Sequence, residues 1–130
     1  MEDTLKKPTI LLIEDDVFMI ELFAKAAAEA GFQVVNIKTG KEAVERIEEI
    51  DPDLTVLDVL LPDMNGFEIL RRIRRTSGGP IRKVFIMSNV SEARDMDEAR
   101  RLGALEYLIK TNITLPEVME KIQKVLGYFE

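Results

Sequence analysis

The chain has 130 residues, of which 46% are hydrophobic and 32% charged, and this is the balance of one globular domain, not of a disordered or fibrous chain. Its net charge of −6 argues against general electrostatic attraction to a nucleic-acid backbone or to an anionic membrane. Cysteine and histidine are absent, which excludes disulfides and thiolate chemistry, so any metal ion must be held by oxygen ligands.

The N-terminal residues before Pro8 lack the apolar stretch that follows the charges of a signal peptide. No segment approaches the roughly 20 consecutive apolar residues that span a bilayer. We therefore expect a cytoplasmic protein with one domain over residues 1–130, a folded core at about 9–127 and no output domain.

The first predicted strand is the apolar run at residues 9–13, bounded by Pro8 and a group of acids. These acids are Glu14, Asp15 and Asp16. The following segment predicts a helix that ends at Gly31. Its expected buried stripe consists of Phe18, Leu22, Ala26 and Ala30, with Met19, Phe23 and Ala27 beside it. The alternating segment 33–38 predicts a second strand nearer the sheet edge.

Thr39 and Glu42 have the spacing of a capping box and predict the start of a second helix. This helix ends before Pro52, because the residue preceding a proline avoids helical geometry. The third predicted strand, 53–58, places Asp58 at its end and continues into the turn sequence Leu61-Pro62-Asp63-Met64-Asn65-Gly66.

A third helix is predicted from Asn65, with Glu68 in its first turn and an apolar side that includes Phe67. We expect its arginines to face outward: Arg71, Arg72, Arg74 and Arg75. The breaker segment 76–80 precedes a fourth strand, 84–87, which ends at Ser88.

The fourth predicted helix starts at Ser91, has the weakest apolar stripe of the set and stops at Gly103. A fifth strand follows at 105–109 and a loop at 110–113. Thr114 and Glu117 then form a second candidate capping box, which opens the last helix.

The alternation of strands and helices predicts a doubly wound α/β domain, with a parallel sheet, helices on both faces and right-handed crossovers. Ligands of such sheets bind at the carboxyl ends of the strands. Several polar side chains are expected at this edge: Glu14, Asp15, Asp16, Asp58, Ser88, Asn89 and Lys110. Crowded carboxylates favour a hard divalent cation, and Mg²⁺ suits an all-oxygen site. A lysine and a hydroxyl beside it could hold a phosphoryl group during transfer.

In these motifs the chain resembles the response-regulator receiver domains of two-component signalling, from Ile10 to about Leu126. The resemblance rests on the acids after the first strand, the Asp58 strand with its turn, Ser88, and the sequence Tyr107-Leu108-Ile109-Lys110. It implies a flavodoxin-like sheet with strand order 2-1-3-4-5 and five helices.

The resemblance also implies roles for single residues. Asp58 would be the nucleophile and phosphorylation site, and Lys110 would pair with the phosphoryl oxygens. Mg²⁺ would be held by Asp15, Asp58 and the backbone carbonyl of Leu60, with Glu14 acting through a water molecule. Ser88 and Tyr107 would form the switch, which changes the face made by the fourth helix, fifth strand and fifth helix.

The implied partners are a sensor histidine kinase or phosphotransfer protein and a downstream output protein. A phosphorylation-dependent homodimer is a further expectation, and neither nucleic acid nor membrane is expected as a direct partner. The resemblance implies that the chain catalyses its own phosphorylation and dephosphorylation but is not a turnover enzyme on an external substrate, so its classification as an enzyme stays open.

Simpler interpretations remain open for single residues. Asp16 fits a helix cap better than a metal ligand, and Ser88 could be an ordinary loop serine. Lys110 could be a surface lysine and Tyr107 a core aromatic with a solvated hydroxyl.

Three alternatives concern the whole chain. A pseudo-receiver would bind a partner without phosphorylation. A phosphatase similar to the haloacid dehalogenases would need a second acid two residues after the nucleophile, where this chain has Leu60. Dinucleotide binding would need a glycine-rich turn where Glu14, Asp15 and Asp16 stand.

The chain departs from the receiver pattern at a few positions. Thr111 stands where most receivers have a proline, often joined by a cis peptide, so we expect a trans bond here because a non-proline cis bond costs about 3 kcal/mol. Asn89 replaces a smaller residue. Leu60 and Val90 occupy positions that influence hydrolysis of the phosphoryl group, and their apolar side chains predict slow self-dephosphorylation.

Overall fold

The structure, a computed structural model, describes residues 6–129. Residues 1–5 and 130 of the expected domain lie outside the described residues, and so does most of the N-terminal segment before Pro8. Five parallel strands form one sheet in the order β2-β1-β3-β4-β5, which confirms the predicted fold class and strand order. The strands are β1 (Thr9–Ile13), β2 (Gln33–Ile37), β3 (Leu54–Leu57), β4 (Val84–Ser88) and β5 (Glu106–Ile109).

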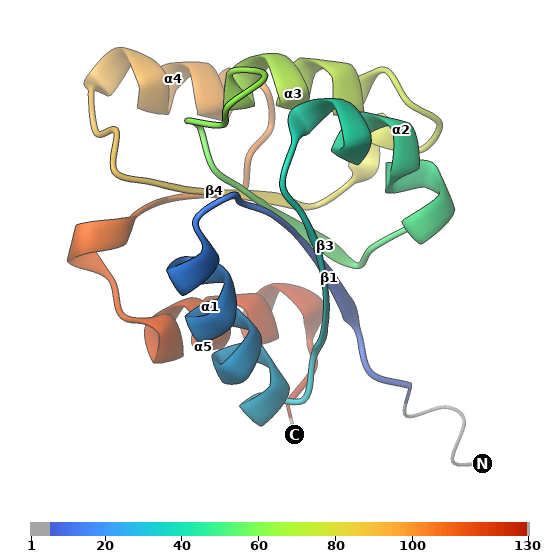
Figure 1. Ribbon diagram of the computed structural model, residues 1–130, viewed down its shortest axis with the longest axis vertical. Helices are drawn as coiled ribbons and strands as arrows, with labels where there is room; N and C mark the ends of the chain where they lie inside the picture. Colours follow the sequence, from blue (N-terminus) through green and yellow to red (C-terminus); the bar gives the residue numbers. More distant parts are fainter. Residues whose placement is uncertain (1–5, 130) are drawn as a thin grey trace.

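Two layers of helices enclose the sheet (Figure 1). One layer holds α1 (Val17–Glu29) and α5 (Leu115–Leu126), and the other holds α2 (Gly40–Ile50), α3 (Gly66–Arg74) and α4 (Ala93–Arg101). Short 3₁₀ turns lie at Gly79–Ile81 and Lys110–Asn112. Within residues 6–129, every helix is too short or too polar to cross a membrane.

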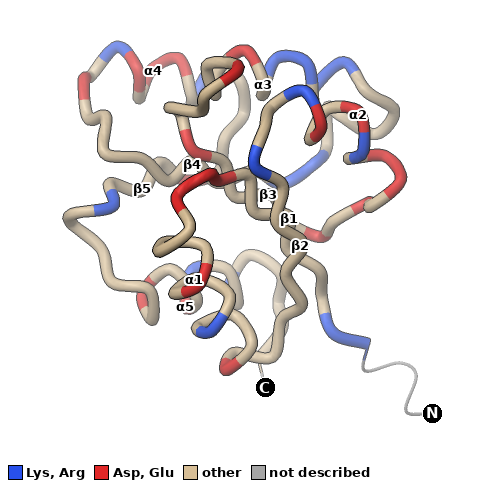
Figure 2. Tube along the Cα trace, in the orientation of Figure 1, with Lys and Arg blue, Asp and Glu red and all other residues tan. Residues whose placement is uncertain are grey.

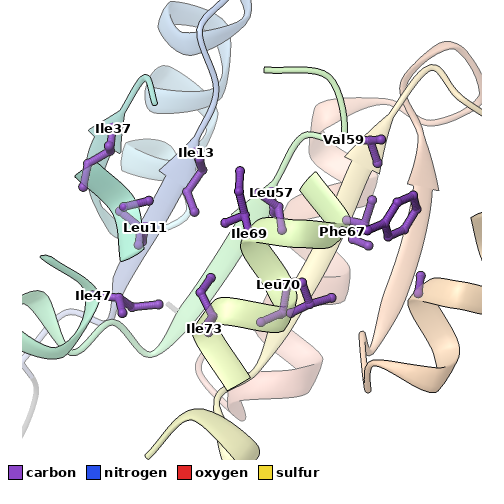
Figure 3. Close-up of a cluster of buried hydrophobic side chains, with 14 residues drawn as sticks. Leu11, Ile13, Ile37, Ile47, Leu57, Val59, Phe67, Ile69, Leu70 and Ile73 are labelled. Atoms are coloured by element: carbon purple, nitrogen blue, oxygen red, sulfur yellow. The ribbon is translucent and has the colours of Figure 1, made fainter. Parts of the chain in front are cut away.

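The hydrophobic core is divided by the sheet into two clusters, because successive side chains of a strand point to opposite faces. Leu11 and Ile13 of β1 pack under α2 and α3, in the cluster shown in Figure 3. Ile10 and Leu12 pack on the other face with Phe23 of α1. Burial of β1 on both faces explains its continuous apolar sequence. It also fixes the position of the acids that follow the C-terminal end of the strand.

The predicted buried stripe of α1 is wrong in part. Phe18 is 69% exposed and Leu22 is 40% exposed, whereas Phe23 and Ala27 are fully buried. A step of four residues advances the helix by about 40° more than a full turn, so a stripe spaced by four drifts around the helix. Because α1 is apolar on more than one side, spacing alone did not identify the side that contacts the sheet.

Side-chain caps place the starts of α1 and α5 as predicted. The Asp16 carboxylate accepts the backbone N–H groups of Phe18 and Met19 at 3.0 and 3.3 Å, which confirms its interpretation as a cap. Thr114 and Glu117 form both bonds of a capping box. These caps satisfy N–H groups that have no partner within the helix.

The start of α2 at Thr39 is confirmed, but its predicted capping box is incomplete, and the start of α4 needs correction. Thr39 caps α2 by accepting the Glu42 N–H, but the Glu42 carboxylate bonds Arg46 instead of returning to the cap, so only half of the capping box forms. The fourth helix begins at Ala93, two residues after the predicted start at Ser91. Glu92 is its cap residue and makes no side-chain bond there.

Arg74 was predicted to face solvent, and this prediction is wrong. Its guanidinium donates hydrogen bonds to the carbonyls of Gly79 and Arg82 at 2.9 and 2.7 Å, and to those of Leu102 and Gly103 at 2.8 and 3.0 Å. Burial lowers the pKa of this group. One arginine at the end of α3 therefore joins the loop before β4 to the turn between α4 and β5.

Candidate functional site

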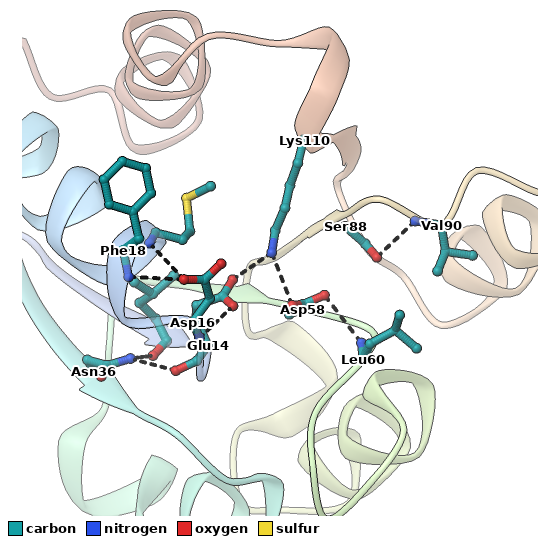
Figure 4. A network of polar contacts seen from close by, with 11 residues as sticks. Glu14, Asp16, Phe18, Asn36, Asp58, Leu60, Ser88, Val90 and Lys110 are labelled. Atoms are coloured by element: carbon teal, nitrogen blue, oxygen red, sulfur yellow. Dashed lines mark hydrogen bonds and ion pairs between the residues drawn. The ribbon is translucent and has the colours of Figure 1, made fainter.

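The carboxyl ends of β1, β3 and β5 bring the predicted acids and lysine together, as Figure 4 shows. The Asp58 N–H donates to the carbonyl of Ile13 at 3.1 Å, so the two strand ends stand side by side. The charges along the chain trace in Figure 2 show acidic residues gathered where the strands end. The sheet therefore positions Glu14, Asp15 and Asp58 as one group.

The three carboxylates each offer an oxygen, and these oxygens lie within 4.8 Å of one another. Glu14 is 2% exposed and Asp58 is 8% exposed, whereas Asp15 is open to solvent. Burial, followed by the nearby charge of Asp58, raises the pKa of Glu14 against the opposing effect of its bond to Lys110. An all-oxygen set of crowded carboxylates fits a hard divalent cation such as Mg²⁺.

Lys110 reaches this group from β5. Its Nζ lies 2.9 Å from Glu14 Oε1 and 3.1 Å from Asp58 Oδ2. Burial acts to lower the lysine pKa, but the bond to Glu14 and the charge of Asp58 outweigh it and raise the pKa above its usual value. No cis peptide occurs within residues 6–129, as expected with Thr111 after the lysine. The altered loop still brings the ammonium group to Asp58.

The turn after Asp58 is held by close backbone packing. The Leu60 N–H donates to Asp58 Oδ1 at 3.2 Å, while the Leu60 side chain is 62% exposed. A Cβ on Gly66 would lie 2.5 Å from the carbonyl oxygen of Asp58, so only glycine allows α3 to start this close to the strand end. The start of α3 thus fixes the backbone that carries Asp58.

Ser88 and Tyr107 are connected through the backbone of Val90. The Ser88 hydroxyl, fully buried at the end of β4, accepts the Val90 N–H at 3.2 Å. The Tyr107 hydroxyl donates to the Val90 carbonyl at 2.6 Å. Burial raises the pKa of Tyr107, with smaller effects from the charges of Asp95 and Asp58. The backbone of one residue in the β4–α4 loop is therefore bonded to both hydroxyl groups.

Sequence reasoning missed two residues that support this site. Asp63, in the turn after β3, accepts the N–H groups of Gly40 and Lys41 at 2.8 and 2.9 Å and so caps α2. Asn36 of β2 donates to the carbonyls at the end of β1. An amide between the apolar residues Val35 and Ile37 was the available signal for Asn36. No local pattern connects Asp63 with the start of a helix that precedes it by more than twenty residues.

An exposed apolar patch adjoins the site at the start of α1. It consists of Val17, Phe18 and Leu22, which are 57%, 69% and 40% exposed. Figure 4 shows the Phe18 ring directed away from the carboxylates, toward the outside of the site. A patch of apolar side chains beside a polar site is a feature of surfaces that bind other proteins.

The sequence is similar to those of several known proteins. The chemotaxis protein CheY of Thermotoga maritima is 29% identical over 117 residues, which cover 89% of this chain and 95% of that protein. The transcriptional regulatory protein AfsQ1 of Streptomyces coelicolor is 35% identical over 103 residues, which cover 79% of this chain and 44% of that protein. The chain therefore spans about half the length of the transcriptional regulators it matches.

Solved structures show the same fold. A CheY-like response regulator receiver domain protein from Methanospirillum hungatei superposes with a TM-score of 0.86 at 24% identity, covering 94% of this chain and 95% of that one. The family described as response regulator receiver domain matches residues 10–123. With this match over most of its length, the chain belongs to the response regulator receiver domains of two-component systems.

Proposed function

We propose that Asp58 accepts a phosphoryl group from a phosphohistidine on a sensor histidine kinase or phosphotransfer protein. The observation that carries this proposal is the contact of a nearly buried aspartate with Lys110, beside two further acids from β1. Carboxylates that serve only the fold are seldom placed this close together with a single lysine to balance them, because their mutual repulsion disfavours the folded state. A site that must receive a charged group and a cation explains the arrangement.

In the proposed transfer, one Asp58 carboxylate oxygen forms a bond to phosphorus as the bond from phosphorus to the histidine nitrogen breaks, and the histidine recovers a proton from solvent. Lys110 pairs with the phosphoryl oxygens, because its Nζ already lies 3.1 Å from the acceptor carboxylate. Mg²⁺ would be held by Asp15, Asp58 and the Leu60 carbonyl, with Glu14 acting through water. When bound, Mg²⁺ neutralises charge on the phosphoryl oxygens.

The switch that we propose uses the connection through Val90. Ser88 turns its hydroxyl toward the phosphoryl group and gives up the Val90 N–H, which loosens the loop that also holds the Tyr107 hydroxyl. Tyr107 then moves inward and changes the surface formed by α4, β5 and α5. That surface binds the output partner, in keeping with α4 having only Ala99 fully buried.

The kinase or phosphotransfer protein docks, in this proposal, on the patch formed by Val17, Phe18 and Leu22. These side chains follow directly after the acids of β1, so a partner that covers them also covers the opening of the site. Apolar side chains that are desolvated beside a polar site supply affinity without contacting the reacting atoms.

The test is incubation with Mg²⁺ and acetyl phosphate, followed by measurement of the intact mass. We expect one added phosphoryl group in the native chain, and no addition in the presence of a chelator or in Asp58→Ala. Asp53→Ala is the matched control, because Asp53 lies at the opposite end of the same strand.

Failure of the native chain to gain mass would contradict the proposal and favour the pseudo-receiver, which binds its partner without phosphorylation. Persistence of the added group in Asp58→Ala would place the acceptor elsewhere.

A further inference from the structure

Asn36 of β2 connects the edge strand to the end of β1, at the point where the acidic residues begin. Its register partner on β1 is Leu12. The side-chain nitrogen Nδ2 donates to the Leu12 carbonyl at 2.9 Å and to the Glu14 carbonyl at 3.2 Å, as Figure 4 shows. An amide nitrogen carries two hydrogens, so both bonds can form together.

The bond to Glu14 replaces a backbone bond that the sheet no longer provides. The ladder between β1 and β2 ends with the pair Ile13 and Ile37, followed by one bond from the Glu14 N–H to the Ile37 carbonyl at 3.1 Å. Beyond this point the chain leaves β2 and turns into α2. Among residues 6–129, the donor that the structure gives to the Glu14 carbonyl is Asn36 Nδ2.

The position of Asp15 depends on this carbonyl. The carbonyl of Glu14 and the N–H of Asp15 belong to one planar peptide group, so a bond that orients the carbonyl also orients the backbone from which Asp15 projects. Asp15 is exposed, and its carboxylate accepts no hydrogen bond from the described residues. Whether this carboxylate can lie within 4.8 Å of the Glu14 and Asp58 oxygens therefore depends on where the backbone places the Asp15 Cα.

We propose that Asn36 is a positioning residue for the cation site, which holds the Glu14–Asp15 peptide so that the Asp15 carboxylate stays beside Asp58. This inference rests on the proposed function, because it assumes that these carboxylates bind a divalent cation. Mg²⁺ requires near-ideal octahedral geometry, whereas Ca²⁺ accepts variable ligand numbers and distances. A displaced Asp15 carboxylate consequently weakens Mg²⁺ binding more than Ca²⁺ binding.

The test is calorimetric titration of the whole chain with Mg²⁺ and, separately, with Ca²⁺. Asn36→Leu keeps the number and branching of the side-chain heavy atoms and removes both donor hydrogens, and the smaller Asn36→Ala is a second variant in case the first does not fold. The control is Gln33→Met, because Gln33 is an amide on the same strand that donates to the Lys7 carbonyl at the other end of the sheet.

We expect the Kd for Mg²⁺ to rise about three- to tenfold in the Asn36 variants, which is the effect of one hydrogen bond of ordinary strength. The Kd for Ca²⁺ rises less than about twofold, and the Gln33 variant binds both ions as the native chain does. If Asn36 served only the stability of the fold, the metal-free variants would be less stable, but the ratio of their affinities for Mg²⁺ and Ca²⁺ would equal that of the native chain.

Equal weakening for the two ions, or no weakening, would overturn the role of Asn36 while leaving the cation site in place. Absence of Mg²⁺ binding by the native chain would overturn the cation site itself and this inference with it.

Discussion

Lys110 Nζ and Asp58 Oδ2 lie 3.1 Å apart although they come from strands that are not neighbours in the sheet, since β4 separates β3 from β5. The long lysine side chain spans the width of the intervening strand β4. Its side chain is only 12% exposed, so the ion pair is shielded from solvent and salt. The Asp58 carboxylate and the Lys110 ammonium group that pairs with it are thus held by separate parts of the sheet.

Replacement of this lysine should separate cation binding from phosphoryl transfer. In Lys110→Met the acidic group loses its bonded ammonium, so we expect Mg²⁺ to bind more tightly. Phosphorylation by acetyl phosphate should slow roughly tenfold to a hundredfold, because a donor to the phosphoryl oxygens is lost. Titration calorimetry and the time course of intact mass measure the two effects. Lys25→Met on the exposed side of α1 is the control, and an unchanged transfer rate in Lys110→Met would contradict the role of the lysine.

Loss of the phosphoryl group should be slow in the native chain. Leu60 is largely exposed and Val90 half-buried, and neither side chain can orient an attacking water molecule by hydrogen bonding. We expect Leu60→Gln together with Val90→Gln to shorten the half-life of the phosphorylated protein about tenfold, which is below the effect of a general base. The half-life is followed by mass after removal of the donor. Leu105→Gln, an exposed position on another part of the surface, should leave it unchanged, and an equal or longer half-life in the double variant would argue against the prediction.

Arg74 should contribute strongly to stability. Arg74→Met keeps much of the apolar stem but leaves four carbonyls without their charged donor, so we expect the free energy of unfolding to fall by about 2–4 kcal/mol. Urea unfolding measures the change. Arg75→Met, at the neighbouring exposed position, should alter stability by no more than about 0.5 kcal/mol. Equal effects of the two substitutions would show that the carbonyl bonds add little.

The contribution of Asp63 to the free energy of unfolding should depend on pH. Bonds from the N–H groups of Gly40 and Lys41 hold the pKa of this carboxyl below its usual value. An acid with a lowered pKa in the folded state binds fewer protons there than in the unfolded state, so its stabilising effect is present at neutral pH and disappears as the pH falls through the folded-state pKa.

The matching measurement is urea unfolding of the native chain and Asp63→Ala at neutral and acid pH. At pH 7 we expect the variant to be less stable by about 1 kcal/mol, the usual effect of a lost helix cap. The difference should shrink as the pH falls below the ordinary range of an aspartate. A difference independent of pH would mean that the ionised carboxylate is not the group that caps α2.

The fold and the gathering of the site followed from patterns that are local in the sequence. Alternating strands and helices implied the parallel sheet, and because parallel strands end at one edge, Glu14, Asp15, Asp58 and Lys110 were expected to lie together. The caps at Asp16 and Thr114 were also predictable, because their partners lie within three residues.

The failures concern contacts that local patterns do not specify. The spacing of Phe18 and Leu22 indicates a helix but not which side of it meets the sheet. The sequence around Arg74 is that of a surface arginine, and only the folded loops bring four carbonyls into hydrogen-bonding distance of its guanidinium. Asn36 and Asp63 act on backbone groups far away in the sequence, and only the assembled sheet brings them there.

In the proposed reaction Asp58, and no other acid of the group, receives the phosphoryl group. Borohydride reduces an aspartyl phosphate to homoserine, so treatment of the phosphorylated protein followed by peptide mass analysis identifies the acceptor directly. We expect homoserine at position 58 only when Mg²⁺ and the phosphodonor are both present. Homoserine at Asp15, or phosphorylated protein that yields none at position 58, would contradict it.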